Sequence, residues 1–102
     1  MNIVFWPAAE ADVAETVAWY ERQADGLGRA LLGELHATLD RIDAGAHRYP
    51  KAHGAARRAL LRRFPCAVYF YEHDEKIVVL AVFHHRRGPD ALRARRGNPP
   101  SD

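Results

Sequence analysis

Two short clusters in the C-terminal half of the chain carry side chains suited to acid–base and phosphate chemistry. His84-His85-Arg86 joins two imidazoles, which titrate near neutrality, to a guanidinium group. Arg62-Arg63 adds two more guanidinium groups, which bind phosphate in a forked geometry. Cleavage of a phosphodiester by its own 2′-hydroxyl needs a base, an acid and cations around the phosphorane. The candidate catalytic residues of such an RNase are His84, His85, Arg62, Arg63 and Arg86.

The charges are unevenly distributed, although the formal net charge is only +2. Residues 8–25 are predominantly acidic, with Arg22 as their only basic residue, whereas arginine predominates from residue 57 onward. This asymmetry predicts an anionic partner for the C-terminal half, either nucleic acid or an acidic protein segment. The simpler alternative is that the arginines only keep a small domain in solution. The candidate target-binding residues are Arg86, Arg87, Arg93, Arg95 and Arg96.

Other kinds of site are disfavoured. Cys66 is the only cysteine, so no disulfide can form within the chain and a reducing cytoplasm is expected. The histidines are scattered, and the adjacent His84 and His85 are expected to point to opposite faces of a sheet, so we predict no metal site. Gly26-Leu27-Gly28 lacks the rest of a nucleotide-binding fingerprint, and we predict no cofactor.

The length of 102 residues suits one compact domain. We expect residues 1–97 to form it and residues 98–102 to be a disordered tail. The N-terminus has no basic run followed by a long apolar stretch, and no segment reaches the roughly 18 apolar residues of a membrane span. The expected protein is soluble and cytoplasmic, without membrane association.

Local patterns predict the elements that position these residues. Residues 2–5 form a short β-type run, and apolar residues at helical spacing follow from Ala8 to Ala24 and from Leu27 to Ile42. The break at Asp25-Gly26 makes the two helices a hairpin. Trp19 and Tyr20 are interpreted as helix–sheet packing residues. A short helix is expected over residues 90–96.

Three strands rich in aromatic and β-branched residues follow the hairpin. We predict them over residues 57–64, 66–73 and 76–84, with a tight turn at Asp74-Glu75 and a strand end or bulge at Pro65. Residues 77–83 are apolar on both faces, which indicates a central strand covered on both sides. The predicted fold class is α+β: a helical hairpin packed on a mostly antiparallel four-stranded sheet, in the order β-α-α-β-β-β, with a short C-terminal helix or tail.

The order and spacing of several motifs resemble the RelE/ParE toxin superfamily, and most closely its ParE-like branch. The resemblance extends from Val4 to about Arg96 and rests on these segments: Trp19-Tyr20-Glu21, Gly26-Leu27-Gly28, Tyr49-Pro50, Arg63-Phe64-Pro65-Cys66-Ala67-Val68-Tyr69, Val79-Leu80-Ala81-Val82-Phe83-His84-His85-Arg86-Arg87 and Pro89. Two positions depart from the pattern, since Cys66 stands where tyrosine is common and Leu92 where tryptophan is common. These departures leave the placement among subfamilies open.

The resemblance implies the toxin of a type II toxin–antitoxin system, neutralised by a cognate antitoxin that folds on it. The ParE-like branch inhibits DNA gyrase, and the RelE-like branch cuts messenger RNA on the ribosome. The RelE-like catalytic complement looks incomplete, because nothing aromatic follows Phe83 and the only lysines are Lys51 and Lys76. We therefore favour a non-enzymatic gyrase inhibitor. A ribosome-dependent endoribonuclease and a weakly toxic antitoxin-binding relative remain as alternatives.

Antitoxin binding is expected along the helical hairpin and across a sheet edge, with acidic and apolar residues of the antitoxin meeting the toxin. On the predicted strand at residues 66–73, Tyr69 and Tyr71 share one face, while Cys66, Val68 and Phe70 share the other. One face should meet the helices, and the other is a candidate partner-binding face. The candidate antitoxin-binding residues are Arg57, Arg58, Arg62, Arg63, Tyr69 and Tyr71.

Overall fold

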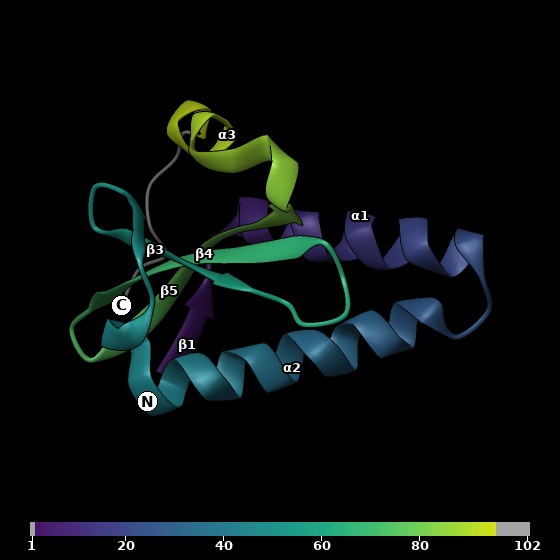
Figure 1. The fold of residues 1–102 in the computed structure, drawn as a ribbon, viewed down its shortest axis with the longest axis horizontal. Helices are drawn as coiled ribbons and strands as arrows, with labels where there is room; N and C mark the ends of the chain where they lie inside the picture. The colour runs from purple at the N-terminus through teal and green to yellow at the C-terminus, as the bar shows by residue number, and fades with distance from the viewer. Residues whose placement is uncertain (1, 96–102) are drawn as a thin grey trace.

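A computed structural model describes residues 2–95 of the chain, except for the side chain of Pro89. Its fold is α+β, as predicted. The helices are α1 (Pro7–Gln23), α2 (Leu27–Gly45) and α3 (Gly88–Ala94), with short 3-10 turns η1 (Ala46–Arg48) and η2 (His85–Arg87). The strands are β1 (Asn2–Phe5), β2 (Lys51–His53), β3 (Ala56–Leu60), β4 (Cys66–His73) and β5 (Lys76–His84). The α1–α2 hairpin lies on one side of the sheet and α3 on the other (Figure 1).

The described residues form one five-stranded mixed sheet in the order β1-β5-β4-β3-β2. The predicted number of four strands was therefore wrong, because β2 was missed. The pairings of β2, β3, β4 and β5 are antiparallel, and β1 pairs in parallel with β5. A parallel pair needs a crossover, which the helical hairpin supplies. β4 and β5 have the predicted bounds, whereas β3 ends at Leu60 instead of residue 64.

The helical hairpin depends on Glu21 and two glycines at its turn. The Glu21 carboxylate accepts backbone N–H bonds from Gly26 and Gly28, each at 2.9 Å, and so satisfies free donors at the start of α2. Gly26 has φ 87°, a left-handed conformation that favours glycine. At Gly28 a Cβ would lie 3.0 Å from the carbonyl oxygen of Val17, so a side chain there would push the helices apart. These contacts fix α1 and α2 against each other.

The core on the hairpin side of the sheet contains the predicted apolar stripe of α2. Leu31, Leu35, Leu39 and Ile42 are buried there. From the sheet they meet one face of β4, formed by Cys66, Val68 and Phe70, together with Ile77 and Val79 of β5. The predicted alternation along β4 is therefore confirmed, although the register shifts between Tyr69 and Phe70.

A second, smaller core lies on the opposite side of the sheet. Tyr69 is fully buried there and Tyr71 packs at its margin. α3 covers it with Leu92, which is 6% exposed. β5 contributes Leu80, Ala81 and Phe83 to this core, so the prediction of a central strand covered on both faces is confirmed.

A charged clasp joins α1, β5 and the end of α3. Arg95 makes a two-bonded ion pair with Asp12, at 2.7 and 2.9 Å, between residues 83 apart in the sequence. The same carboxylate accepts the backbone N–H of Val82 at 2.9 Å, and Arg95 donates to the carbonyl oxygen of Leu80 at 2.9 Å. The pairing of β1 ends one step earlier, at the bond from the Trp6 N–H to the Val79 carbonyl. The clasp therefore satisfies the β5 backbone where its partner strand stops.

No described helix is long and apolar enough to cross a membrane. The predicted short helix over residues 90–96 corresponds to α3, which begins earlier, at Gly88. The predicted disordered tail at 98–102 lies outside the described residues.

Candidate functional site

The two clusters that suggested phosphate chemistry meet at one end of the sheet. The backbone N–H of His85 donates to the carbonyl oxygen of Pro65 at 3.0 Å, which joins η2 to the loop between β3 and β4. This contact brings Arg62 and Arg63 close to η2. A hollow of about 400 Å³ has both arginines and His85 among its lining residues. We call this region, from the β3–β4 loop to η2, the arginine-rich end.

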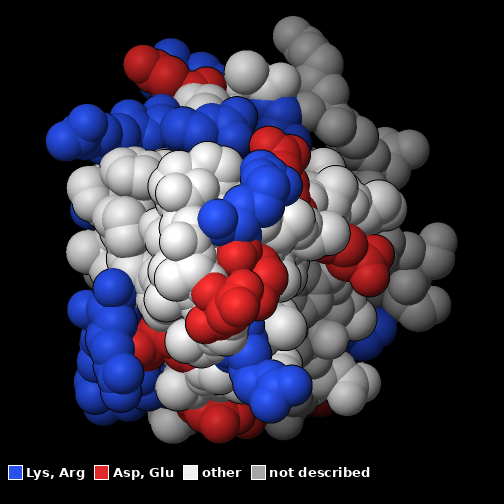
Figure 2. Space-filling model, turned by 90° about the vertical axis from the view of Figure 1, so that its right-hand side faces the viewer, with Lys and Arg blue, Asp and Glu red and all other residues white. Residues whose placement is uncertain are grey.

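Figure 2 shows this end of the molecule, which also carries the α1–α2 turn. Lys and Arg side chains lie along the upper edge and at the lower left, around a broad uncharged area. Acidic side chains are interleaved near the centre of the view. Arg63 is 86% exposed, and its ion pair with Glu34 is a long one, at 4.0 Å. Arg62, Arg86 and Arg87 are also exposed, so their charges face solvent.

The sequence predicted that the adjacent His84 and His85 point to opposite faces of the sheet, but in the structure they do not. Their rings lie 4.8 Å apart at 42°, because β5 ends at His84 and His85 begins the η2 turn. His84 Nδ1 accepts the backbone N–H of Arg86 at 3.0 Å. In the neutral ring Nε2 then carries the proton, so it can donate a hydrogen bond but cannot accept a proton. Among the residues described, no three His, Cys, Asp or Glu side chains gather as a metal site would require.

An open groove of about 480 Å³ lies between α1 and the end of β5. Trp19 and Arg22 line its helical side, and Phe83, His84 and Arg87 line the other. The Trp19 side chain is 50% exposed, so the prediction that it packs between helix and sheet was wrong. Tyr20 does pack there, edge to face with Phe64 at 5.0 Å. The Arg87 guanidinium lies 4.4 Å from the centre of the Phe83 ring, a cation–π contact that holds it beside the groove.

Cys66 lies at the floor of the same groove and is almost completely buried. Burial raises the pKa of its thiol, although a hydrogen bond from Tyr20 acts in the opposite direction. Burial, and then Cys66, raises the pKa of Tyr20. A thiol with a raised pKa is a poor nucleophile at neutral pH, so we interpret Cys66 as a buried structural residue.

Arg93 on α3 and Arg95 directly after it differ from the arginines of the arginine-rich end. Arg95 is 14% exposed and is held by the clasp with Asp12. Arg93 is 63% exposed and pairs with Asp90 at 3.0 Å, one turn away. Of the five predicted target-binding arginines, Arg86 and Arg87 present their charge to solvent, and Arg96 lies outside the described residues.

The predicted antitoxin-binding residues fall in three places. Arg57 donates to the carbonyl oxygen of Tyr49 at 2.6 Å, so its guanidinium is engaged inside the molecule. Arg58 follows it on the opposite face of β3, on the side of α3. Tyr69 is completely buried, whereas Tyr71 is half-buried. Arg62 and Arg63 belong to the arginine-rich end.

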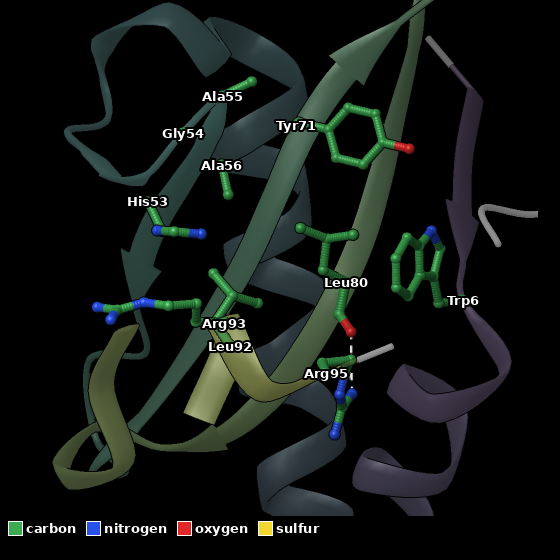
Figure 3. Close-up of a pocket in the computed structure, with 10 residues that line it drawn as sticks. All are labelled: Trp6, His53, Gly54, Ala55, Ala56, Tyr71, Leu80, Leu92, Arg93 and Arg95. Carbon is green, nitrogen blue, oxygen red and sulfur yellow. Dashed lines mark hydrogen bonds between the residues drawn. The ribbon is translucent and has the colours of Figure 1, made fainter. Parts of the chain in front are cut away.

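A further hollow of about 380 Å³ opens beside α3, on the Tyr71 side of the sheet (Figure 3). Trp6, Leu80 and Leu92 form its apolar wall, and Arg95 is drawn bonded to the Leu80 carbonyl at its margin. The indole N–H of Trp6 and the hydroxyl of Tyr69 are buried and have no hydrogen-bond partner among the residues that the structure describes. No sequence pattern had indicated this hollow, because its walls come from segments far apart in the chain.

An apolar groove also runs between the two helices of the hairpin. It has a volume of about 430 Å³, and it lies between Val13 and Val17 of α1 and Leu32, Leu35 and Leu39 of α2. Glu10 and His36 stand at its margin. Such a groove can accept the apolar face of a peptide.

The fold is of the RelE/ParE type, with a helical hairpin on one face of a mixed sheet and exposed arginines at its end. Residues 3–89 match the family model described as the ParE toxin of the type II toxin–antitoxin system parDE, so the chain belongs to this family. It is the toxin component of a type II toxin–antitoxin system.

Solved structures support the assignment of the fold. The chain is similar to one from the chromosomal ParDE TA system of P. aeruginosa, with a TM-score of 0.66 and 18% sequence identity. The match covers 82% of this chain and 95% of the other. At this identity the likeness shows the fold alone. No curated protein matches the chain significantly.

Proposed function

We propose that this toxin inhibits DNA gyrase in the cytoplasm and is held inactive by a cognate antitoxin. The observation that carries the proposal is the family match over residues 3–89. An inhibitor of this kind needs a surface that binds its target and no bond-breaking groups. Arg86 and Arg87, exposed beside the β3–β4 loop, supply a charged surface suited to gyrase, to its DNA, or to both.

Ribosome-dependent RNA cleavage is the second candidate, and the convergence of His84, His85, Arg62, Arg63 and Arg86 favours it. The hydrogen bond from the Arg86 backbone N–H to His84 Nδ1 argues against RNA cleavage, because it leaves Nε2 of the neutral ring as a donor. His85 remains as the candidate base, and the described residues between His85 and Arg95 include no tyrosine or lysine to share the work. The arrangement therefore suits binding of an anion better than cleavage.

The first experiment compares the two targets directly, using toxin freed from its antitoxin. Gyrase supercoiling is measured beside translation, with messenger cleavage mapped by primer extension. The proposal predicts blocked supercoiling and intact messenger. Cleaved messenger with unaffected gyrase would overturn it and assign the arginine-rich end to catalysis.

A substitution experiment then separates binding from catalysis at the same surface. H84A and H85A should retain most of the gyrase inhibition, because neither imidazole is required for a binding inhibitor. Circular dichroism and thermal unfolding confirm that the variants remain folded. A loss of messenger cleavage of 100-fold or more, on the order of one general acid–base group, would instead indicate a catalytic role.

The antitoxin is proposed to place apolar residues in the groove between α1 and α2, with its carboxylates directed to Arg62 and Arg63. A disordered segment that folds on the toxin stabilises it in proportion to its affinity. The protein encoded beside the toxin gene should therefore raise the melting temperature. Val17→Lys in the groove should reduce this shift, whereas Lys51→Glu on β2 should not. No shift with the wild-type toxin would remove the antitoxin from the proposal.

A further inference from the structure

We infer that the groove between α1 and the end of β5, together with the arginine-rich end, binds single-stranded nucleic acid directly. This inference goes beyond inhibition of gyrase and does not depend on it. It assigns a ligand class to a surface with two distinct parts, one aromatic and the other cationic.

The aromatic part is the groove around Trp19. Trp19 is 50% exposed, and its ring makes an edge-to-face contact with Tyr20 at 4.9 Å. His84 lines the groove from the end of β5, and its ring lies 4.8 Å from that of His85, tilted by 42°. The volume of about 480 Å³ is ample for one planar base. An exposed indole in an open groove offers a stacking platform to an unpaired base, which a duplex does not present.

The cationic part lies on both sides of that groove. Arg22 and Arg87 line the groove itself, and the Phe83 ring holds the Arg87 guanidinium in place. Arg62 and Arg63 line the adjoining hollow. Guanidinium groups bind phosphate oxygens in a forked geometry, so these residues match the backbone on either side of a bound base.

The two hollows form one path along the surface. Both are lined by Pro65 and Cys66, and the bond from His85 to Pro65 places the two histidines at their junction. The path therefore runs from Trp19 past His84 and His85 to Arg62 and Arg63. An extended backbone can follow such a path and leave a base beside Trp19.

The carboxylates near this path are few and partly engaged. Glu15 lines the groove opposite His84 and Arg87. Glu34 lies between Arg41 and Arg63, at 3.8 and 4.0 Å. Glu21 is occupied by the backbone of the α1–α2 turn. An acidic peptide would use the same arginines, but it would have no need of an exposed indole with two adjacent imidazoles beside it. These rings favour the bases of a nucleic acid.

The test measures binding of fluorescently labelled oligothymidylate and oligouridylate to the full chain, by anisotropy, without gyrase or ribosomes. Binding should weaken steeply between about 50 and about 200 mM salt, because each neutralised phosphate releases counterions. Trp19 fluorescence should be quenched on binding, and W6F isolates this signal from the second indole. The tighter of the two oligonucleotides identifies DNA or RNA as the source.

Variants distinguish a defined site from general attraction. Trp19→Ala should weaken binding roughly tenfold, and Trp19→Phe should restore most of it, as stacking requires. Arg87→Glu and Arg63→Glu should each weaken binding and flatten the salt dependence. Lys51→Glu makes the same change of charge on β2 and should have little effect.

Four results would overturn the inference. The first is the absence of binding at low salt, and the second is equal weakening by Lys51→Glu and Arg87→Glu. The third is a duplex that competes as well as a single strand. The fourth is polyglutamate that competes as well as the oligonucleotides, which would assign the surface to an acidic protein segment. Because gyrase is absent from these assays, failure here leaves the supercoiling result intact, and the reverse also holds.

Discussion

The arginines of the C-terminal half separate into two groups that the sequence does not distinguish. At the arginine-rich end, Arg62, Arg63, Arg86 and Arg87 face solvent. Directly after α3, Arg95 is enclosed by Asp12 and the β5 backbone. The first group is available to a partner, and Arg95 is a part of the fold. A run of basic residues therefore predicts a binding surface only through those residues whose charged groups have no partner inside the protein.

The largest expected effect tests the structural side of this comparison. Arg95→Ala should destabilise the protein by about 3 kcal/mol, because it leaves a mostly buried carboxylate and the Leu80 carbonyl without their partner. Asp12→Ala should cost a similar amount. Arg86→Ala, its matched control, should stay within about 0.5 kcal/mol. Urea unfolding measures all three, and equal stabilities for Arg95→Ala and Arg86→Ala would remove the distinction.

The next effect concerns activity. Reversing both charges, as in R86E with R87E, should reduce gyrase inhibition by at least about tenfold, since like charges oppose binding of an anionic target. The free energy of unfolding should change little. Reversal at Arg93, which already pairs with Asp90, should reduce inhibition less. Supercoiling assays on the folded variants provide the measurement. A stronger loss from Arg93→Glu would place the target surface on α3.

A smaller effect is expected from Glu21, the acidic residue that anchors the turn between α1 and α2. Bonds from the backbone N–H groups of Gly26 and then Gly28 lower the pKa of Glu21 below its ordinary value. Its contribution to stability is therefore present above the ordinary pKa and is lost as the pH falls through the lower folded pKa. Glu21→Gln should remove this dependence and lower the melting temperature at neutral pH modestly. If the melting temperatures of the wild-type protein and of Glu21→Gln change in parallel through the acidic pH range, Glu21 does not anchor the turn.

The smallest effect is expected for the exposed pair on α3. Arg93→Ala should change the free energy of unfolding by less than about 0.5 kcal/mol, because a solvated pair one helical turn apart contributes little. The same urea titration that detects Arg95→Ala measures it. A cost comparable to that of Arg95→Ala would mean that α3 is held by more than the clasp.

The elements that follow a local pattern could be predicted from the sequence. Both helices, the turn at Asp74-Glu75 and the bounds of β4 and β5 depend on the periodicity and turn residues of neighbouring positions. β2 was missed because Lys51-Ala52-His53 is too short to show an alternation. The bound for β3 was too long because Leu61 to Phe64 look strand-like, although the chain turns there.

The site was predictable only as a set of residue types. Arg62, Arg63, His84 and His85 were recognised, but their meeting depends on the pairing of Cys66 with His84 and on the backbone bond between His85 and Pro65. The exposure of Trp19 was missed, because an aromatic residue on an amphipathic helix usually packs inward. The role of Arg95 could not be found, since its partners are the carboxylate of Asp12 and the carbonyl of Leu80, distant in sequence.

The clasp also determines when the protein can finish folding during its synthesis. A ribosome synthesises Asp12 long before Arg95, and β1 waits for β5 because Phe5 pairs with Val79. A nascent chain that stops short of β5 has a helical hairpin without the central strand on which it packs. The toxin therefore completes its fold only after Arg95 has left the exit tunnel, and contacts so distant in sequence form slowly. Because the chain is made from its N-terminus, the folded toxin therefore appears only after residues 1–95 have been translated.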